Sequence, residues 1–320
     1  MFQQILVPLD GSIRAEQAIP VAAHISRVCG GSVLLLEVVT TPIDYGPYPS
    51  HLSVLMQEKL EANHDAALYY LASVTYSKDL VRVKKNVEVL SGDPAESILS
   101  LVHMRRFDLI VMCSHGHAGL KRWRPGRIAQ MVARHSPVPV LVLCEGSVAL
   151  ATTLADAARP IRALIGLDGS ALAEEVLVPA AHLVNALSVP AHGALHLLQV
   201  LRMPLLSFGS VKQAQQAADA YLKAVADRLR QGELADLKLS ITSSVAMGVD
   251  VADTLIRQAE HGEGAIGMNF IDGFDLVAIA THGRGGVQRW VMGSVTDRVL
   301  GATKLPLLIV RPQRQRAATK

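Results

Sequence analysis

The chain contains one internal repeat, and this repeat limits its possible fold more than any other feature of the sequence. The segment ILVPLDGSIRAEQAIPVAAHI, which begins at Ile5, aligns with ALIGLDGSALAEEVLVPAAHL, which begins at Ala163. Farther along, FDLIVMCSHGHAGLKRW aligns with FDLVAIATHGRGGVQRW, and SPVPVLVLCEG aligns with TKLPLLIVRPQ. The offset between the copies is larger here, which places an insertion within HGEGAIGMNFIDG of the second copy. The repeat therefore predicts two homologous domains, at about 1–147 and 160–313.

Each copy is predicted to alternate strands with helices. In the first copy the expected strands are QILVPLD, SVLLLEVV, VRVKKNVEVL, FDLIVMCS and VPVLVLC, and the expected helices cover about 13–29, about 52–77, a segment beginning at Asp93 and Pro94, and a short segment after the glycine loop. Half of the residues are hydrophobic but only 4% are aromatic, so the cores must be aliphatic, as buried parallel strands require. The predicted fold class is α/β, with two tandem domains, each a five-stranded parallel sheet covered by helices on both faces.

Charge and cysteine usage narrow the class of protein. The formal net charge is +3, from 31 basic and 28 acidic residues, so neither nucleic acid nor a membrane is an expected partner. The three cysteines have no paired spacing, which favours a reducing compartment. The segment MFQQILVPLDGS lacks the pattern of a signal peptide, and no apolar run is long enough for a membrane span. We therefore expect a cytoplasmic protein, with an Ala-rich linker at 148–159 and a solvated basic tail at 314–320.

A glycine-rich loop in the second copy, IATHGRGGVQRWVMGS, follows an apolar strand that is expected to end near Ala280. Gly293 and Ser294 are expected to open the next helix, whose first N–H groups and positive dipole end would face the loop. Gly293 would let a phosphate approach the backbone, and Ser294 would offer its hydroxyl. The alternative interpretation is that Ser294 is only a helix N-cap and the glycines are only turn residues.

The pattern of the whole chain resembles the universal stress protein family, with two such domains in tandem. Nucleotide-binding members carry a glycine, two residues, a second glycine, nine residues, a third glycine, and then Ser or Thr. The second copy has Ala280, Gly283, Gly293 and Ser294 at these positions. The DGS turns and the closing segment LPLLIV also fit, so the resemblance covers nearly the whole chain. It implies Rossmann-like domains of the adenine nucleotide alpha hydrolase type.

The resemblance also implies a ligand, which is ATP or AMP, with or without Mg²⁺, and is held mainly by the second domain. The aspartate after the first strand would lie near the adenosine, a residue of the second strand would contact adenine through its backbone, and the helix start would hold the phosphates. The residues carried over to the second domain are Gly166, Asp168, Val200, Ala280, Gly283, Gly293, Ser294 and Val295. The methyl group of Ala280 is a mild departure, which we expect to weaken binding at most.

The first domain departs further from the family pattern. Its equivalent residues are Pro8, Asp10, Val38, Cys113, Gly116, Gly126 and Arg127. Arg127 has no capping oxygen, and Pro125 removes a backbone donor from the loop. We therefore expect the first domain to bind nucleotide poorly or not at all. Pairing of the Arg127 guanidinium with a phosphate is the alternative.

Other groups of polar residues in the sequence have the composition of possible sites. The segment CSHGH at 113–117 has ligand types that suit zinc, but only one of its histidines recurs in the second copy, so no metal site is expected. His115 and His282 are expected at the pocket mouth, and Cys144 as an inert core residue. For Asp10 and Asp168 the sequence leaves two roles open, a turn that caps the first helix and contact with a ligand. No Walker or kinase motif is present, so no catalytic residue is assigned, and at most a weak ATPase activity is expected.

The fifth strand of each domain has an apolar edge that needs cover. The resemblance implies that these strands pair with each other, which would make the chain an internal pseudo-dimer, and two chains could associate further as a homodimer. Three functions remain in view at this point: an adenine-nucleotide sensor in which the ligand orders residues 281–294 and changes the surface offered to an unknown protein partner, an interaction protein that binds no nucleotide, and an enzyme that uses one.

Overall fold

The structure is a computed structural model in which part of the chain is described. The described residues are 1–40, 50–114, 126–144, 150, 159–203, 208–232, 234–262, 273–282 and 292–312, without the side chains of 50–56 and 208–210. The expectations for His115, Gly116, Pro125 and Gly283 lie outside the described residues, as do those for the basic tail, nearly all of the linker and most of the predicted insertion.

The two domains repeat the same order of elements. The first domain comprises β1 (Gln4–Leu9), α1 (Ile13–Glu16), α2 (Ala18–Cys29), β2 (Ser32–Val39), α3 (Ser50–Val74), β3 (Lys84–Ser91), α4 (Pro94–Met104), β4 (Leu109–Cys113), α5 (Arg127–His135) and β5 (Val140–Leu143). The second comprises β6 (Arg162–Leu167), α7 (Ala171–Glu174), α8 (Leu177–Ser188), β7 (Ala194–Arg202), α9 (Phe208–Gln231), β8 (Ser240–Gly248), α10 (Val251–His261), β9 (Leu276–Ala280), α11 (Ser294–Ala302) and β10 (Leu307–Val310). The predicted α/β fold class is confirmed.

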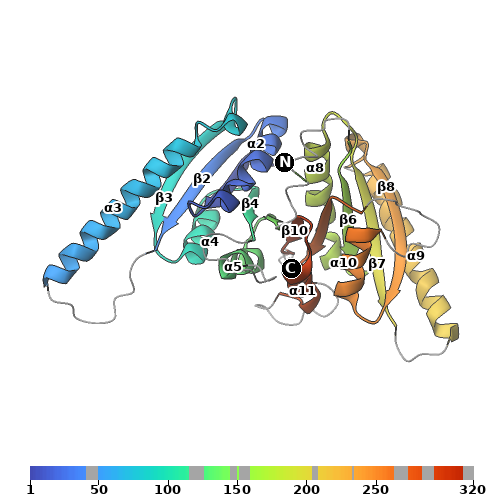
Figure 1. Cartoon of the computed structure of the whole chain (residues 1–320). Coiled ribbons are helices and arrows are strands. Elements are labelled where there is room, and N and C mark those ends of the chain that lie inside the picture. Colours follow the sequence, from blue (N-terminus) through green and yellow to red (C-terminus); the bar gives the residue numbers. More distant parts are fainter. Residues whose placement is uncertain are drawn as a thin grey trace, which may run out of the picture.

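The strands form one continuous sheet in the order β3-β2-β1-β4-β5-β10-β9-β6-β7-β8. Within each domain the five strands are parallel. At the centre β5 and β10 pair in antiparallel fashion, with Leu141 opposite Leu308. The fifth strands therefore cover each other's edges, and the sheet runs unbroken through both domains (Figure 1).

Side-chain alternation along the strands produces two apolar layers, one on each face of the sheet. Ile5 and Val7 of β1 contribute to the layer that contains residues of α2, α3, α8 and α9. Leu6, between them, contributes to the layer that contains residues of α4, α5, α10 and α11. Helices consequently cover both faces, as a parallel sheet buried on both sides requires.

Local sequence explains where several elements begin. The predicted cap at α4 is confirmed, because Asp93 Oδ1 accepts hydrogen bonds from the backbone N–H groups of Ala95 and Glu96, at 3.0 and 3.1 Å. The strand expected from Val81 begins only at Lys84, because Arg82 has a φ of 60°, a left-handed conformation that interrupts an extended chain.

Two predicted helices have different limits in the structure. The segment 13–29 is not one helix but two, with Gln17 between α1 and α2. The helix expected to reach Ser77 ends at Val74, and Ser77 instead caps a short 3₁₀ turn at Lys78–Leu80. Within the part of the chain that the structure describes, no helix has the length and apolarity needed to cross a membrane.

The central strand pairing gives a first test. Leu308 is fully buried beside β5 and β9, so Leu308→Ala should leave a cavity and lower the free energy of unfolding by about 2–5 kcal/mol. The measurement is the urea midpoint followed by circular dichroism. Val178→Ala is the control, because Val178 is 41% exposed, and it should change stability by less than about 0.5 kcal/mol. Equal effects of the two substitutions would contradict the packing described for β10.

Candidate functional site

The turn after the first strand of each domain is held by its aspartate. Asp168 Oδ1 accepts hydrogen bonds from the backbone N–H and the hydroxyl of Ser170, at 3.0 and 2.6 Å. Ser170 in turn is the N-cap of α7, with its Oγ accepting from the N–H of Ala173. Asp10 and Ser12 make the same contacts before α1. Of the two roles left open for the aspartates, the turn former is confirmed, but the N-cap of the following helix is the serine two residues later and not the aspartate.

The start of α11 is fixed against the end of β9 by two hydrogen bonds, and a third joins this strand end to β10. Thr281 N–H donates to the carbonyl of Val310, at 2.8 Å, and the N–H of Gly293 donates to the carbonyl of Thr281, at 2.8 Å. The hydroxyl of Thr296 donates to the carbonyl of Ala280, at 2.9 Å. A Cβ atom on Gly293 would lie 3.0 Å from that Thr281 carbonyl oxygen, so a glycine permits the close approach. The end of β9 and the start of α11 are thereby joined by a hydrogen bond between their backbones.

Ser294 is the first residue of α11 and is exposed. The N-cap is Gly293, which has no side chain to offer, so the interpretation of Ser294 as a helix N-cap is wrong. The first-turn N–H groups of an α-helix have no partner within the helix. The helix start therefore presents backbone donors and a serine hydroxyl on the same turn, with the positive end of the helix dipole behind them.

The first domain has the same backbone arrangement with a different side chain. The N–H of Gly126 donates to the carbonyl of Ser114, at 2.7 Å, and α5 begins at the exposed Arg127. A guanidinium thus stands where the second domain has a hydroxyl.

Cys113 stands at the position of Ala280, the first position of the glycine pattern. Its thiol donates to the carbonyl of Arg14, at 2.9 Å, and burial raises its pKa to about 12. Burial likewise raises the pKa of Cys144 to about 12, in agreement with a core role for that residue. In the described ranges, no three His, Cys, Asp or Glu side chains are grouped as metal ligands would be.

The second-domain residues expected at the site lie on neighbouring strands. The sheet order β9-β6-β7 brings the ends of the strands that carry Ala280, Asp168 and Val200 to one edge. Gly166 is needed for packing in any case, because a Cβ there would lie 2.7 Å from Leu255 Cδ1 and 2.9 Å from Ile279 Cγ2. The described part of the predicted site is thus assembled at the carboxyl ends of the parallel strands, where such sheets bind ligands.

Sequence reasoning missed a polar cluster in the layer beneath the aspartate turns. In the second domain the Tyr221 hydroxyl donates to Glu174, at 3.0 Å, and Arg228 forms an ion pair with the same carboxylate. In the first domain the Tyr70 hydroxyl donates to Glu16, at 3.1 Å. Burial, followed by the adjacent glutamate, raises the pKa of both tyrosines, which therefore stay protonated. Because the repeat aligns Glu16 with Glu174, the sequence could have revealed the glutamates of this cluster, although not its tyrosines.

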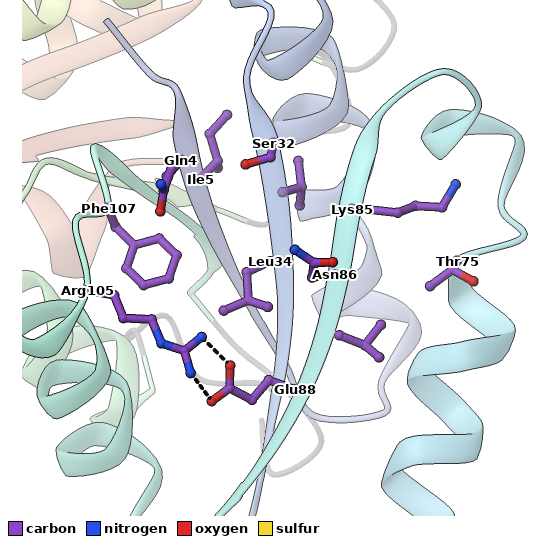
Figure 2. A pocket seen from close by; sticks show the side chains of 12 residues that line it. Gln4, Ile5, Ser32, Leu34, Thr75, Lys85, Asn86, Glu88, Arg105 and Phe107 are labelled. Atoms are coloured by element: carbon purple, nitrogen blue, oxygen red, sulfur yellow. Dashed lines mark hydrogen bonds and ion pairs between the residues drawn. The ribbon is translucent and has the colours of Figure 1, made fainter.

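A groove of about 600 Å³ lies beside the amino-terminal halves of β1, β2 and β3, away from the strand ends (Figure 2). Arg105 crosses it and forms a bidentate pair with Glu88, with nitrogen–oxygen distances of 2.6 and 2.9 Å. Residues that line the groove include Gln4, Leu34, Asn86, Glu88, Arg105 and Phe107. It is not part of the candidate nucleotide site.

In the second domain the position of Leu34 is taken by His196, which is buried in the sheet. Its Nδ1 and Nε2 contact the hydroxyls of Thr242 and Ser244, at 2.8 and 2.7 Å, and its ring lies 5.4 Å from that of Phe274. Burial lowers the pKa of His196 to about 4. The imidazole is therefore neutral at pH 7, with one nitrogen donating and the other accepting.

The fold and the strand-end site define a tandem α/β protein with two doubly wound domains. The model of the universal stress protein family matches residues 1–143 and 162–311. A universal stress protein of Mycobacterium tuberculosis is 22% identical over 321 residues, covering 96% of each chain. One from Methanocaldococcus jannaschii is 29% identical over 143 residues, covering 45% of this chain and 82% of its own.

Solved structures show the same fold over the whole chain. The crystal structure of a universal stress protein from Archaeoglobus fulgidus has a TM-score of 0.61 at 17% identity, covering 97% of this chain and 99% of its own. With both domains matched by the family model, the chain belongs to the universal stress protein family.

The buried histidine predicts a pH dependence of stability. The pKa of His196 is lower in the folded chain than the ordinary 6.5, so the unfolded chain binds a proton more readily. The contribution of His196 to the free energy of unfolding is therefore complete above pH 6.5. It decreases by a total on the order of 3 kcal/mol as the pH is lowered towards 4. Urea unfolding at pH 7.5, 6, 5 and 4.5 measures the loss. His196→Leu, which introduces the residue of the first domain, should show a shallower pH dependence, and an unchanged slope would contradict the assignment.

Proposed function

We propose that this universal stress protein binds an adenine nucleotide, ATP or AMP, mainly in its second domain. The observation that carries the proposal is the start of α11, where Gly293 is bonded to the end of β9 and Ser294 leaves its hydroxyl exposed beside the first-turn N–H groups. Such a helix start binds phosphate through backbone donors and the helix dipole. The side chain of Ser294 is not needed to complete the helix, which supports a role toward a ligand.

The other second-domain residues have complementary roles in this proposal. Asp168 lies on the neighbouring strand end, with its Oδ1 engaged in the turn, and would face the adenosine. Val200 would contact adenine through its backbone groups, and Val295 would add a backbone N–H for the phosphates. Gly283 completes the set, although it lies outside the described residues. Family membership supports this assignment, because the spacing of Gly283, Gly293 and Ser294 is that of nucleotide-binding members, with Ala280 in place of their first glycine.

We propose a binding role and not a catalytic one. Backbone N–H groups and a hydroxyl hold an anion, but catalysis of phosphoryl transfer also needs a positioned nucleophile or water and cationic charge on the transferred group. Nucleotide bound between the end of β9 and the start of α11 would bridge the two ends of the intervening loop. The surface there would differ between the bound and unbound chain, which is the physical basis for a sensor that a protein partner reads.

Substitution at Ser294 tests the proposal. Ser294→Ala removes the hydroxyl alone, and Ser294→Arg introduces the residue of the first domain. Both should weaken ATP binding by about tenfold or more, the loss expected for one hydrogen bond to a charged group. The measurement is isothermal titration with ATP and Mg²⁺, with thermal melting to verify folding. Because Ser294 is exposed, stability should change little.

Arg127→Ser in the first domain is the matched control and should leave the second-domain affinity unchanged. Equal ATP affinity in the wild type and both Ser294 variants would remove the phosphate assignment. A wild-type chain with no ATP binding and no ATP-induced rise in melting temperature would instead favour an interaction protein that uses no nucleotide.

A further inference from the structure

The second strand of each domain carries a polar residue at an equivalent position near its carboxyl end. Glu37 of β2 pairs in register with Leu9, and Gln199 of β7 pairs in register with Leu167. Each partner leucine directly precedes the aspartate of the turn, Asp10 or Asp168. Since side chains alternate along a strand, Glu37 and Gln199 face the same layer as Leu35 and Leu197, two residues earlier. Both polar residues therefore lie beneath the aspartate turn.

Each of these side chains has a buried oxygen that lacks a hydrogen-bond partner among the described residues. The atoms are Oε2 of Glu37 and Oε1 of Gln199. Gln199 is buried, with only 5% of its surface exposed. An unsatisfied buried acceptor destabilises the fold and is rare in native proteins, which makes it a marker of a missing partner. At the edge that holds Asp168, an N–H or O–H group of a ligand can be that partner.

The electrostatic surroundings of the two positions differ. In the first domain, burial and then the charge of Asp10 raise the pKa of Glu37. The charges of Glu16, Glu37 and Asp10 all contribute to the raised pKa of Tyr70. Three carboxyl groups thus surround one tyrosine at the strand ends of the first domain.

In the second domain one of these three carboxyl groups is absent, and the negative charge of another is partly balanced by an arginine. Tyr221 is influenced by Glu174 and Asp168, and the charge of Arg228 acts in the opposite direction. The position of Glu37 is occupied by the neutral Gln199 in the second domain, and Arg228 forms an ion pair with Glu174. The same framework is therefore less negative in the second domain, which favours an anionic ligand there.

We propose that this position, together with the Arg127 and Ser294 pair, selects the domain that accepts the nucleotide: the neutral amide of Gln199 admits it to the second domain, and the carboxylate of Glu37 opposes it in the first. The inference rests on the proposed function and adds a specificity residue to it. Gln199 Oε1 accepts a hydrogen bond from an amino or hydroxyl hydrogen of the nucleoside. Repulsion between the Glu37 carboxylate and the phosphates opposes binding in the first domain.

Reciprocal substitutions in the full chain test this selection, with isothermal titration of ATP and of adenosine as probes. The wild type should bind one ATP. Gln199→Glu should weaken ATP by about tenfold or more, because a like charge is added, and should change adenosine, which carries no phosphate, by less than about threefold. Gln199→Leu removes the acceptor without adding charge, so it should weaken ATP and adenosine by the same factor. Glu37→Gln combined with Arg127→Ser should create a second ATP site, whereas Arg127→Ser alone should not.

Thermal melting of each variant separates misfolding from lost binding. If Gln199→Glu fails to fold, the Glu37→Gln, Arg127→Ser double variant still decides the matter, because it removes a carboxylate from an acidic cluster and changes one exposed residue, so it should not lower stability. Unchanged ATP affinity in folded Gln199→Glu, or an equal loss for ATP and adenosine in that variant, would overturn charge selection. A single ATP site in the Glu37→Gln, Arg127→Ser double variant would overturn the role of Glu37. Absence of ATP binding in both the wild type and this double variant would instead overturn the proposed function, and this inference with it.

Discussion

The antiparallel pairing of β5 with β10 is the interaction on which the rest of the molecule depends. Each of these strands is the last of its domain, is only four residues long and is completely apolar. Alone, each would leave an exposed apolar edge with unpaired backbone groups. Their mutual pairing removes both edges and makes one ten-stranded sheet. This pairing also brings helix α11 of the second domain next to α5 of the first, where a guanidinium nitrogen of Arg134 lies 3.3 Å from Oδ1 of Asp297.

The two domains use one backbone framework for sites of different chemistry. In both domains the N–H of a glycine donates a hydrogen bond to the carbonyl of the residue that follows the fourth strand, and the next helix begins directly after this glycine. The side chains that this framework presents are Arg127 in one case and Ser294 in the other. Beneath the aspartate turns, Glu37 and Gln199 differ by one charge on the same strand register. The two domains thus share the backbone geometry of this helix start, while the charge around it differs.

Much of the fold was predictable, because it depends on interactions between residues close in sequence or on strict alternation. The cap by Asp93, the end of β9 at Ala280 and the start of α11 after Gly293 are of this kind. The break at Gln17 and the late start of β3 were missed, because each depends on the local backbone conformation more than on the apolar pattern. The contact between Tyr221 and Glu174 was missed because it joins two helices far apart in the chain.

The sequence by itself determined the duplication, the α/β class and the turn residues that follow each strand. The alignment of the repeats indicates the first, the periodicity of apolar residues the second, and the residue types typical of turns the third. It left open whether Ser294 is a cap and whether the aspartates cap their helices. Only the tertiary structure decided those questions, and only it revealed that His196 is buried between two hydroxyls and that Gln199 has an unsatisfied oxygen. The physical reason is that burial and hydrogen-bond partners depend on segments brought together by folding, which a linear pattern does not contain.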